Sequence, residues 1–521
     1  MKDTLLAVDC GTQSLRAHIF TPDGRLGATE KISYAPYESP RPGWAEQDPL
    51  LFWESLCRAC RNLKERSPDL FSRIAGMGIA AQRATMICMD RRGEPLGPAI
   101  TWLDQRKAAP VWNPGPLKPF IKIIGASDPL HKAQTDAKCN WIAQNRPDIW
   151  RRTACYAQVS GFLHHRLTGT FRDGTASQIG HIPFDYKKQT WSGPFSINSR
   201  IFPVPREKLP DLVSSGEILG YVTEKASSVT GVTQGTPVVA CGSDKGCETL
   251  GAGVFHPEMA SLSFGTTATV QTTTSKYFEP LGFMPAYPAP IPGRYNPEVE
   301  IFRGYWMITW FKKEFGYPEI QRAHIRGIPP EQLLDELLAK TPPGAMGLVL
   351  QPFWSPGLHN PDAKGSLIGF GDVHTRAHIY RALIEGLAYA LLDGLHHIEK
   401  RGGTMVKSLA VSGGASRSDA ICQISADIFN RPLVRGETWE TSGLGAAIAT
   451  SVGLGIHPDF MSAVNRMVRI QRQFVPSPEN VHLYHRLHTE VYQGIYRALA
   501  PLYRKIRDIT GYPEKNHNSS R

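Results

Sequence analysis

The sequence lacks the features of a membrane or secreted protein. No stretch approaches the roughly 18 consecutive apolar residues that a transmembrane helix needs. The first residues, MKDTLLAVDCGTQS, reach the charged Asp9 after a short apolar run and contain neither a signal-peptide core nor a cleavage site. The nine cysteines are scattered, and the single CxxC of Cys57 and Cys60 has no second pair. We therefore expect a cytoplasmic protein with no disulfide scaffold and no membrane partner.

Signatures of nucleic-acid binding and of P-loop enzymes are also lacking. The formal net charge is +11, but Lys and Arg are dispersed and no basic run is interleaved with aromatics. We therefore expect no nucleic-acid partner, and the positive surface suits anionic small ligands such as nucleotides. There is no GxxxxGK[ST] motif and no set of protein-kinase motifs. A nucleotide, if bound, must be held by loops of another kind.

Strand and helix patterns alternate along the chain, which predicts an α/β protein. The length of 521 residues exceeds what one core usually holds, so two large domains are expected. Asp48 is the expected N-cap of a helix, with Pro49 at its first position. The elements expected in the first half are a strand pair over 5–24, a helix over 48–65, a strand, loop and strand over 74–90, an irregular Pro- and Gly-rich segment over 107–131, and helices over 136–150 and 156–167.

The second half shows a related plan. Its strand pair over 261–273 is joined by a Gly-Thr turn, like the pair over 5–24, which predicts two halves of one design with a boundary near 245–260. The other elements expected here are a strand, small-residue turn and helix over 236–254, a long helix over 374–401, a strand, glycine turn and helix over 408–429, and a helix of small residues over 442–455.

Three glycine turns stand between a strand and the next element. Small residues let backbone N–H groups approach phosphate oxygens, and hydroxyl groups add donors. A single turn of this kind is more often only a turn, but three in one chain, two of them matched between the halves, favour a bound nucleotide. Arg16, in the strand after the first turn, is a further candidate for a phosphate contact. The turns are Gly11-Thr12-Gln13-Ser14, Gly265-Thr266-Thr267 and Gly413-Gly414-Ala415.

Two carboxylates follow buried strands. Asp9 lies beside the first glycine turn, where a phosphate would require a cation, so Mg²⁺ is implied if ATP binds there; a turn-capping role is the alternative. Asp244 follows an apolar strand at the end where α/β sheets place ligands. Phosphoryl transfer needs a base for the attacking hydroxyl, and Asp244 is a candidate. From local sequence alone, a helix N-cap explains Asp244 better.

Two polar segments that follow apolar strands suit a sugar. They are Gln82-Arg83 and the run from Trp102 to Arg106, which includes Asp104. Amide, guanidinium and carboxylate groups bind vicinal hydroxyls, and an aromatic ring suits the C–H face of a sugar. Ordinary surface loops are the simpler explanation of each segment taken alone.

Taken in order, these segments resemble the FGGY carbohydrate kinases, from about residue 4 to about residue 495. DCGTQSLRAHIFTPDG resembles the first phosphate hairpin of the family, CGSDKGCETLGAG the segment of the catalytic Asp, and SFGTTA the second phosphate loop. GSLIGFGDVHTRAHIYRALIEGLAYAL resembles the second family signature, and VSGGASRSDAICQISADIFNRPL the adenosine motif. The ordered set is far more specific than any single motif.

The resemblance implies two actin-like (ribonuclease-H-like) α/β domains with an interdomain cleft. Residues 1–250 would form the domain with the sugar site, and residues 251–521 the domain with most of the nucleotide site and a C-terminal helical tail. The implied activity is ATP-dependent phosphorylation of a hydroxyl of a small sugar or polyol, with a ketose as first candidate and Mg²⁺ as cofactor. The resemblance leaves a homodimer open.

The resemblance also assigns roles to residues. It makes Asp244 the general base and places Asp9 and Asp244 at Mg²⁺. The implied sugar contacts are Gln82, Arg83, Trp102, Asp104 and Lys245. The implied ATP contacts are Gly11, Thr12, Gln13, Ser14, Arg16, Gly265, Thr266, Thr267, Gly413, Gly414, Ala415 and, on the adenine side, Ser416 or Arg417.

Two positions depart from the family pattern. Ala84 stands where glycerol kinases have Glu, and Lys245 where they have Gln and pentulose kinases have Asn. A cation beside Asp244 is expected to lower the pKa of its carboxyl, or to bind an anionic group of the substrate. The combination resembles an uncharacterised sugar-kinase subgroup, closer to pentulose kinases than to glycerol kinases. These departures leave open a non-catalytic actin-like regulator that binds nucleotide and sugar; an actin-like chaperone ATPase would leave the sugar-facing segments without a role.

Overall fold

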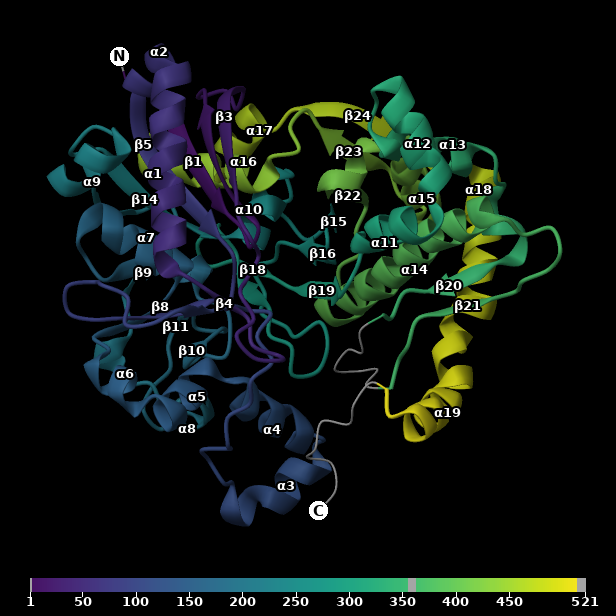
Figure 1. The fold of residues 1–521 in the computed structure, drawn as a ribbon, viewed down its shortest axis with the longest axis horizontal. Coiled ribbons are helices and arrows are strands. Elements are labelled where there is room, and N and C mark those ends of the chain that lie inside the picture. Colours follow the sequence, from purple (N-terminus) through teal and green to yellow (C-terminus); the bar gives the residue numbers. More distant parts are fainter. Residues whose placement is uncertain (1, 355–361, 513–521) are drawn as a thin grey trace. The chain divides into compact units, whose positions relative to one another are not determined.

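The computed structural model describes residues 2–354 and 362–512, and the chain divides into two compact units (Figure 1). Unit 1 comprises Met1–His256, Thr273–Pro297 and Glu440–Arg469, and unit 2 comprises Pro257–Thr272, Glu298–Trp439 and Ile470–Arg521. The units are therefore not two contiguous stretches of sequence. Two segments beyond residue 256 pack with the N-terminal part of the chain.

Unit 1 is built on a six-stranded sheet with the order β13-β14-β5-β1-β2-β3. Its three central strands β14, β5 and β1 are parallel, whereas β13, β2 and β3 pair antiparallel with their neighbours. The strands span β1 Thr4–Cys10, β2 Ser14–Phe20, β3 Leu26–Ser33, β5 Ile74–Ala81, β13 Ile218–Tyr221 and β14 Pro237–Ser243. The predicted strand pair over 5–24 is confirmed by β1 and β2. The predicted strand, loop and strand over 74–90 are confirmed by β5 and by β6 (Met86–Met89), which belongs to a different sheet.

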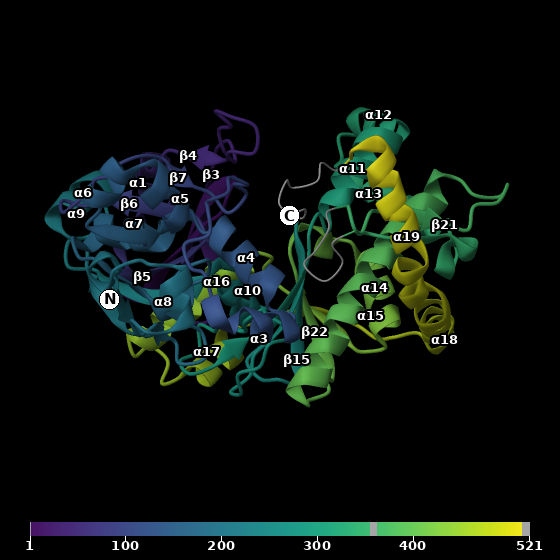
Figure 2. The ribbon, with the colours of Figure 1, turned by 90° about the horizontal axis from the view of Figure 1, so that it is seen from below.

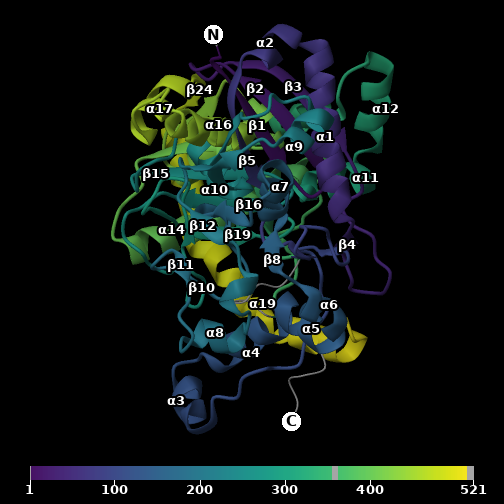
Figure 3. The ribbon, with the colours of Figure 1, turned by 90° about the vertical axis from the view of Figure 1, so that its left-hand side faces the viewer.

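Helices cover both faces of this sheet. Every residue of β1 is buried, and its side chains alternate between two cores. Leu6 and Val8 pack in the core that includes α1 (Pro49–Arg66) and α7 (Val159–Thr168). Leu5 and Ala7 pack in the core formed with the three helices on the other face (Figure 3). These helices are α10 (Asp244–Gly251), α16 (Thr441–Gly453) and α17 (Phe460–Met467).

The start of α1 follows the predicted capping pattern. Asp48 is the N-cap and accepts a hydrogen bond from the Leu50 N–H at 2.9 Å, and Pro49 occupies the first helical position. The prediction of an irregular segment over 107–131 is wrong in part, because α3 (Lys118–Ile123) and α4 (Ser127–Asp136) lie there. Their prolines fall in the first turn, where a missing N–H breaks no helical bond.

A smaller four-stranded sheet of unit 1 carries the segments that follow β5. Its order is β4-β7-β6-β8, with β4 Glu46–Gln47, β7 Ala99–Ile100 and β8 Cys155–Gln158. The helix expected over 156–167 therefore starts later, because its first residues form β8 and α7 begins at Val159. The sheet positions the loops that contain Arg83 and Trp102.

Glycines allow α10 and α16 to pack with their backbones in contact. A Cβ added at Gly445 would lie 1.9 Å from the Cys247 carbonyl oxygen, and one added at Gly251 would lie 2.0 Å from the Thr441 carbonyl oxygen. The prediction of a small-residue helix suited to close packing is thus confirmed. Because α10 begins at Asp244, this contact also fixes the position of that carboxylate.

Unit 2 repeats the plan of unit 1. Its sheet has the order β19-β16-β15-β22-β23-β24, in which β15, β22 and β23 are parallel and the other three pair antiparallel with their neighbours. This is the pairing pattern of the first sheet, strand for strand, and it confirms the predicted design of two related halves. The strands span β15 Met259–Phe264, β16 Ala268–Thr272, β19 Glu298–Ile301, β22 Ser408–Ser412, β23 Leu433–Gly436 and β24 Ile470–Phe474.

The predicted helices of unit 2 are present (Figure 2). Helix α14 spans Arg376–Gly402 and α15 spans Asp419–Phe429, and the two pack against each other. Helices α18 (Pro478–Arg486) and α19 (Gln493–Thr510) end the described chain. Within residues 2–354 and 362–512, no helix combines the length and the apolarity needed to cross a membrane.

Candidate active site

The carboxyl ends of the three parallel strands of unit 1 meet at one edge of the sheet. Cys10 of β1 pairs with Ala81 of β5, and Ala81 pairs with Ser243 of β14. The residues that follow are Gly11, Gln82 and Asp244, so three of the predicted site segments emerge side by side. Open α/β sheets bind ligands at this edge.

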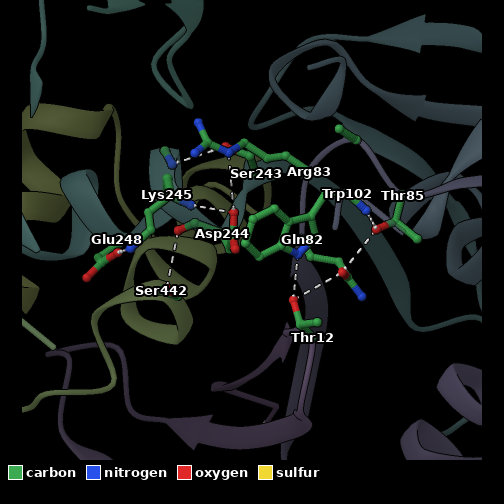
Figure 4. A network of polar contacts seen from close by, with 12 residues as sticks. Thr12, Gln82, Arg83, Thr85, Trp102, Ser243, Asp244, Lys245, Glu248 and Ser442 are labelled. Atoms are coloured by element: carbon green, nitrogen blue, oxygen red, sulfur yellow. Dashed lines mark hydrogen bonds and ion pairs between the residues drawn. The ribbon is translucent and has the colours of Figure 1, made fainter. Parts of the chain in front are cut away.

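Asp244 is the first residue of α10, and Ser243 is the N-cap. The Ser243 hydroxyl accepts the Gly246 N–H at 3.1 Å, so the local interpretation of Asp244 as the N-cap is wrong. The Asp244 carboxylate accepts its neighbour's N–H, from Lys245, at 2.8 Å, and its side chain is 28% exposed (Figure 4). Its carbonyl oxygen accepts the Ser442 hydroxyl of α16 at 3.2 Å. Asp244 is thus held in place by these hydrogen bonds, while part of its side chain stays accessible to a ligand.

Two cations lie near Asp244, and each has a second contact. The Lys245 ammonium is 2.7 Å from the Glu248 carboxylate, one helical turn further on. Arg83 Nε is 3.9 Å from Asp244 Oδ1, and its guanidinium lies 5.2 Å from the centre of the Tyr287 ring. Burial raises the pKa of Asp244, while Arg83 and Lys245 oppose that rise. Lys245 therefore lowers the pKa of Asp244 as predicted, but burial outweighs this effect and the net shift is upward.

The charge of Asp9 interacts with that of Asp244. Its carboxylate is 3.2 Å from Arg16 NH1, and Arg16 Nε is 3.7 Å from Glu440 at the start of α16. Burial raises the pKa of Asp9 to about 7 against the effect of Arg16, and the charges of Asp244 and Glu440 raise it further. Carboxylates that repel each other in this way are stabilised by a cation.

These carboxylates fit a magnesium site completed by a ligand. Among the described residues, no group of three or more His, Cys, Asp or Glu side chains is arranged to hold a metal ion. Mg²⁺ does not require one, since it is usually bound by one or two carboxylates together with substrate phosphates and water. Asp9 and Asp244 supply that number of carboxylates.

The predicted sugar contacts Gln82 and Trp102 are joined to the phosphate hairpin. The Trp102 indole Nε1–H donates to the Thr12 hydroxyl at 2.9 Å, and that hydroxyl donates to Gln82 Oε1 at 3.3 Å (Figure 4). Thr85 also donates to Gln82 Oε1, at 3.1 Å. Residues that the sequence assigns to two different ligands therefore share one network.

Asp104 is placed differently from the other predicted sugar contacts. Its side chain is 1% exposed, and both oxygens accept hydrogen bonds, from the Ala45 N–H and from the N–H and guanidinium of Arg106. Arg106 also pairs with Glu46 and stacks on two rings, those of Trp44 and Trp141. In this structure the Asp104 carboxylate supports the loop that carries Trp102.

This geometry predicts that Asp104→Asn acts mainly on stability. The substitution removes the carboxylate partner of a buried guanidinium that keeps Glu46, so we expect a loss of about 2 kcal/mol. Thermal unfolding measures it, and kcat below the transition should change little. Asp211→Asn is the matched control, because its pair with Arg206 is exposed and should contribute little. A large rise in sugar KM with unchanged melting would contradict the supporting role.

The predicted phosphate hairpin at Gly11–Ser14 is held tightly by its own unit. The Gly11 N–H donates to the Ser14 carbonyl at 3.0 Å, and the Tyr34 hydroxyl donates to the Gly11 carbonyl at 2.7 Å. Gln13 is exposed at the tip, whereas Ser14 is buried. The hairpin is thus rigid at its base and open at Gln13.

In unit 2, two of the predicted ATP turns are in contact. Gly413 follows β22 with φ of +86°, and a Cβ there would lie 2.7 Å from the Phe264 carbonyl carbon and 3.0 Å from the Gly265 nitrogen. Only glycine fits this combination of conformation and close approach. The Ser416 hydroxyl closes the turn at Gly413–Ala415 by donating to the Gly413 carbonyl at 2.6 Å. The structure therefore brings the turn at Gly265–Thr267 and the turn at Gly413–Ala415 together.

Several residues near these groups were missed by the sequence analysis. Trp439 is one of them: it is 45% exposed, and the predicted adenine-side residue Arg417 stacks on it with 4.4 Å between the guanidinium carbon and the ring centre. Glu248 could have been found from its spacing of three residues from Lys245 on a helix. Tyr287 carries no such local signal, because it reaches unit 1 from a distant part of the chain.

The fold is shared with solved sugar kinases. A gluconate kinase from Lactobacillus acidophilus superposes with a TM-score of 0.81 at 20% identity, covering 96% of this chain and 99% of that one. A xylulose kinase from Rhodospirillum rubrum gives a TM-score of 0.81 at 24% identity, covering 96% and 100%. The predicted two-domain α/β class, with its two actin-like domains, is confirmed.

The chain belongs to the FGGY family of carbohydrate kinases, whose N-terminal domain matches residues 4–251 and whose C-terminal domain matches residues 260–454. The uncharacterized sugar kinase YgcE of Escherichia coli (strain K12) is 29% identical over 515 residues, which cover 98% of this chain and 96% of that protein. A xylulose kinase of Lactococcus lactis is 27% identical over 500 residues, covering 95% and 96%. The predicted family and the predicted enzyme class are confirmed.

Proposed function

We propose that the enzyme transfers the γ-phosphoryl group of ATP to a hydroxyl of a small sugar or polyol, with a ketose as first candidate. One observation carries this proposal. Asp244 stands at the ligand-binding edge of the sheet with an accessible carboxylate, and Gln82 and Arg83 emerge from the adjacent strand β5. A base, an amide and a guanidinium in one place suit a polyhydroxylated substrate.

In the proposed step, Asp244 accepts the proton of the attacking hydroxyl. The sugar oxygen forms a bond to the γ-phosphorus, the bond from that phosphorus to the bridging oxygen of ADP breaks, and the proton stays on Asp244 until it is released to solvent. Burial strengthens Asp244 as a base because it raises the pKa of the carboxyl. Arg83 balances the charge of the ionised carboxylate.

Asp9 and Asp244 are the proposed carboxylates for Mg²⁺, which when bound would neutralise phosphate charge during the transfer. Arg16 holds the Asp9 carboxylate in place and adds a positive charge beside the hairpin. The exposed Gln13 and the backbone of Gly11 are the proposed phosphate contacts of unit 1. Lys245, paired with Glu248, is proposed to face the sugar through its aliphatic stem or its ammonium.

The glycine turns of unit 2 are proposed to bind the nucleotide. The backbone N–H groups of Gly265, Thr266 and Gly414 are proposed to donate hydrogen bonds to phosphate oxygens. Arg417 and the exposed ring of Trp439 form a stacked pair that offers a planar surface to a base.

Gly413→Ala is expected to raise KM for ATP about ten-fold or more, with a much smaller change in KM for the sugar. The added methyl group would overlap the backbone at Phe264 and strain a positive φ, so the two turns must separate. Steady-state kinetics with each substrate varied measures the difference. Gly403→Ala is the matched control, since it strains a positive φ of +71° in the same unit but nothing lies within 4 Å of its added Cβ, and equal effects of the two variants would contradict the proposal.

The proposed function is tested by sugar-dependent ADP formation. A panel of pentuloses, hexuloses and alditols is assayed with ATP and Mg²⁺, and at least one member should raise ADP formation far above the rate without sugar. Tight ATP binding with no sugar-dependent turnover on the whole panel would instead support the non-catalytic regulator.

A further inference from the structure

A closed ring of hydrogen bonds joins Trp102, Thr12, Gln82 and Thr85 (Figure 4). The Trp102 indole N–H donates to the Thr12 hydroxyl at 2.9 Å, and that hydroxyl donates to Gln82 Oε1 at 3.3 Å. Thr85 donates to the same oxygen at 3.1 Å, and the Trp102 backbone N–H donates to the Thr85 hydroxyl at 3.3 Å. The ring therefore begins and ends on Trp102.

The Thr12 hydroxyl uses its only proton within this ring. A hydroxyl has one proton to donate, and in Thr12 that proton goes to Gln82, while a lone pair accepts the indole N–H. The Thr12 carbonyl is held separately by Gln47 Nε2 at 3.1 Å. Thr12 thus anchors the phosphate hairpin to the residues on the sugar side instead of offering its proton to a phosphate.

Trp102 is the most exposed member of the ring, and Thr12 is half-buried. Gln82 is 3% exposed and Thr85 is fully buried, whereas Trp102 is 37% exposed. Because its N–H is used by Thr12, Trp102 can offer a ligand only the face or edge of its ring. A ligand that packs on the Trp102 indole can therefore affect the hairpin through the hydrogen bond from the indole N–H to Thr12.

We propose that Trp102 is a positioning residue that holds the phosphate hairpin through Thr12 and couples sugar binding to nucleotide binding. A sugar packed on the indole restrains the ring, which keeps its N–H on Thr12 and the hairpin in the conformation that binds phosphate. The linkage is reciprocal, so nucleotide should raise sugar affinity by the same factor. This inference rests on the proposed function for the identity of the two ligands.

A double-mutant cycle tests the link. Trp102→Phe keeps an aromatic ring and removes the N–H, Thr12→Val keeps the branched shape and removes the hydroxyl, and the double variant removes both. Trp191→Phe is the matched control, because its indole N–H donates to the Pro210 carbonyl at 2.8 Å outside the ring. Calorimetry gives the Kd of ADP with Mg²⁺ for each protein, with and without the panel sugar that gives the highest turnover.

We expect Trp102→Phe and Thr12→Val each to weaken ADP binding about five-fold, the size of one lost hydrogen bond. The double variant should be no weaker than either single variant, and Trp191→Phe should match the wild type. Wild-type protein should bind ADP more tightly with sugar present. This increase in ADP affinity should be smaller in Trp102→Phe, in Thr12→Val and in the double variant.

Two outcomes overturn the proposal: unchanged ADP affinity in Trp102→Phe, or losses that simply add in the double variant. Both are measured without sugar, so they decide the link even if no panel sugar is phosphorylated. Failure of the proposed function would be recognised by a different result. Wild-type protein would then show no sugar-dependent ADP formation, whatever the double-mutant cycle gives.

Discussion

Asp244→Asn is expected to lower kcat for the sugar about 1,000-fold, within the range that a positioned general base contributes. The amide keeps the size of the side chain and can still accept the Lys245 N–H, so α10 should form as before. It cannot take the proton of the attacking hydroxyl. The Kd of ADP without Mg²⁺ should change much less than kcat, because none of the turns proposed to hold the nucleotide includes the Asp244 side chain.

A matched variant separates this effect from a general loss of charge. Asp148 also lies in the first turn of a helix of unit 1, α6 (Pro147–Arg152), and its replacement by Asn should leave kcat unchanged. Sugar-dependent turnover by Asp244→Asn within ten-fold of the wild type would remove Asp244 from the role of base. The confirmed family membership would stand, and another group would have to accept the proton.

Gly445→Ala is expected to cost about 3 kcal/mol of stability and to lower the melting midpoint by roughly 6 °C. Its Cβ would lie 1.9 Å from the Cys247 carbonyl oxygen, which belongs to the backbone and cannot rotate away. Helices α10 and α16 must therefore move apart. Since Asp244 is the first residue of α10, kcat should also fall at temperatures well below the transition.

Gly494→Ala provides the opposite case. Gly494 lies in α19, has no atom within 4 Å of an added Cβ, and does not have a positive φ. Alanine there should raise stability by about 0.5–1 kcal/mol through helix propensity alone. If Gly445→Ala behaved like Gly494→Ala, with no loss in melting or in kcat, the close packing of α10 on α16 would not be what positions Asp244.

Local patterns predicted much of the fold. Asp48 and Pro49 marked the start of α1 because capping depends on residues within one turn. The two Gly-Thr hairpins revealed the repeated plan, which the matching strand orders of the two sheets confirm. The resemblance, carried by several motifs in order, predicted the family.

Features that depend on distant contacts were not predictable in this way. The loop-like context of Asp104 gave no sign that Ala45 and Arg106 would surround its carboxylate. Lys245 suggested a lowered pKa for Asp244, but the depth at which β14 ends decides the direction, and depth is a property of the packed sheet. The roles of the individual site residues stay predictions that the variants above would test.

Unit 1 is assembled from segments that lie far apart in the sequence, and this has a consequence for synthesis of the chain. Helix α16 covers β1, β5 and β14, yet it comes from residues 441–453, nearly 200 positions after the last of these strands. On the ribosome, the N-terminal sheet emerges with one apolar face covered only by α10, and the rest of that face stays uncovered until α16 has been made. A nascent chain of this protein is therefore exposed to aggregation while residues 244–440 are made, and a fragment that stops at residue 250 should require a chaperone to remain dispersed.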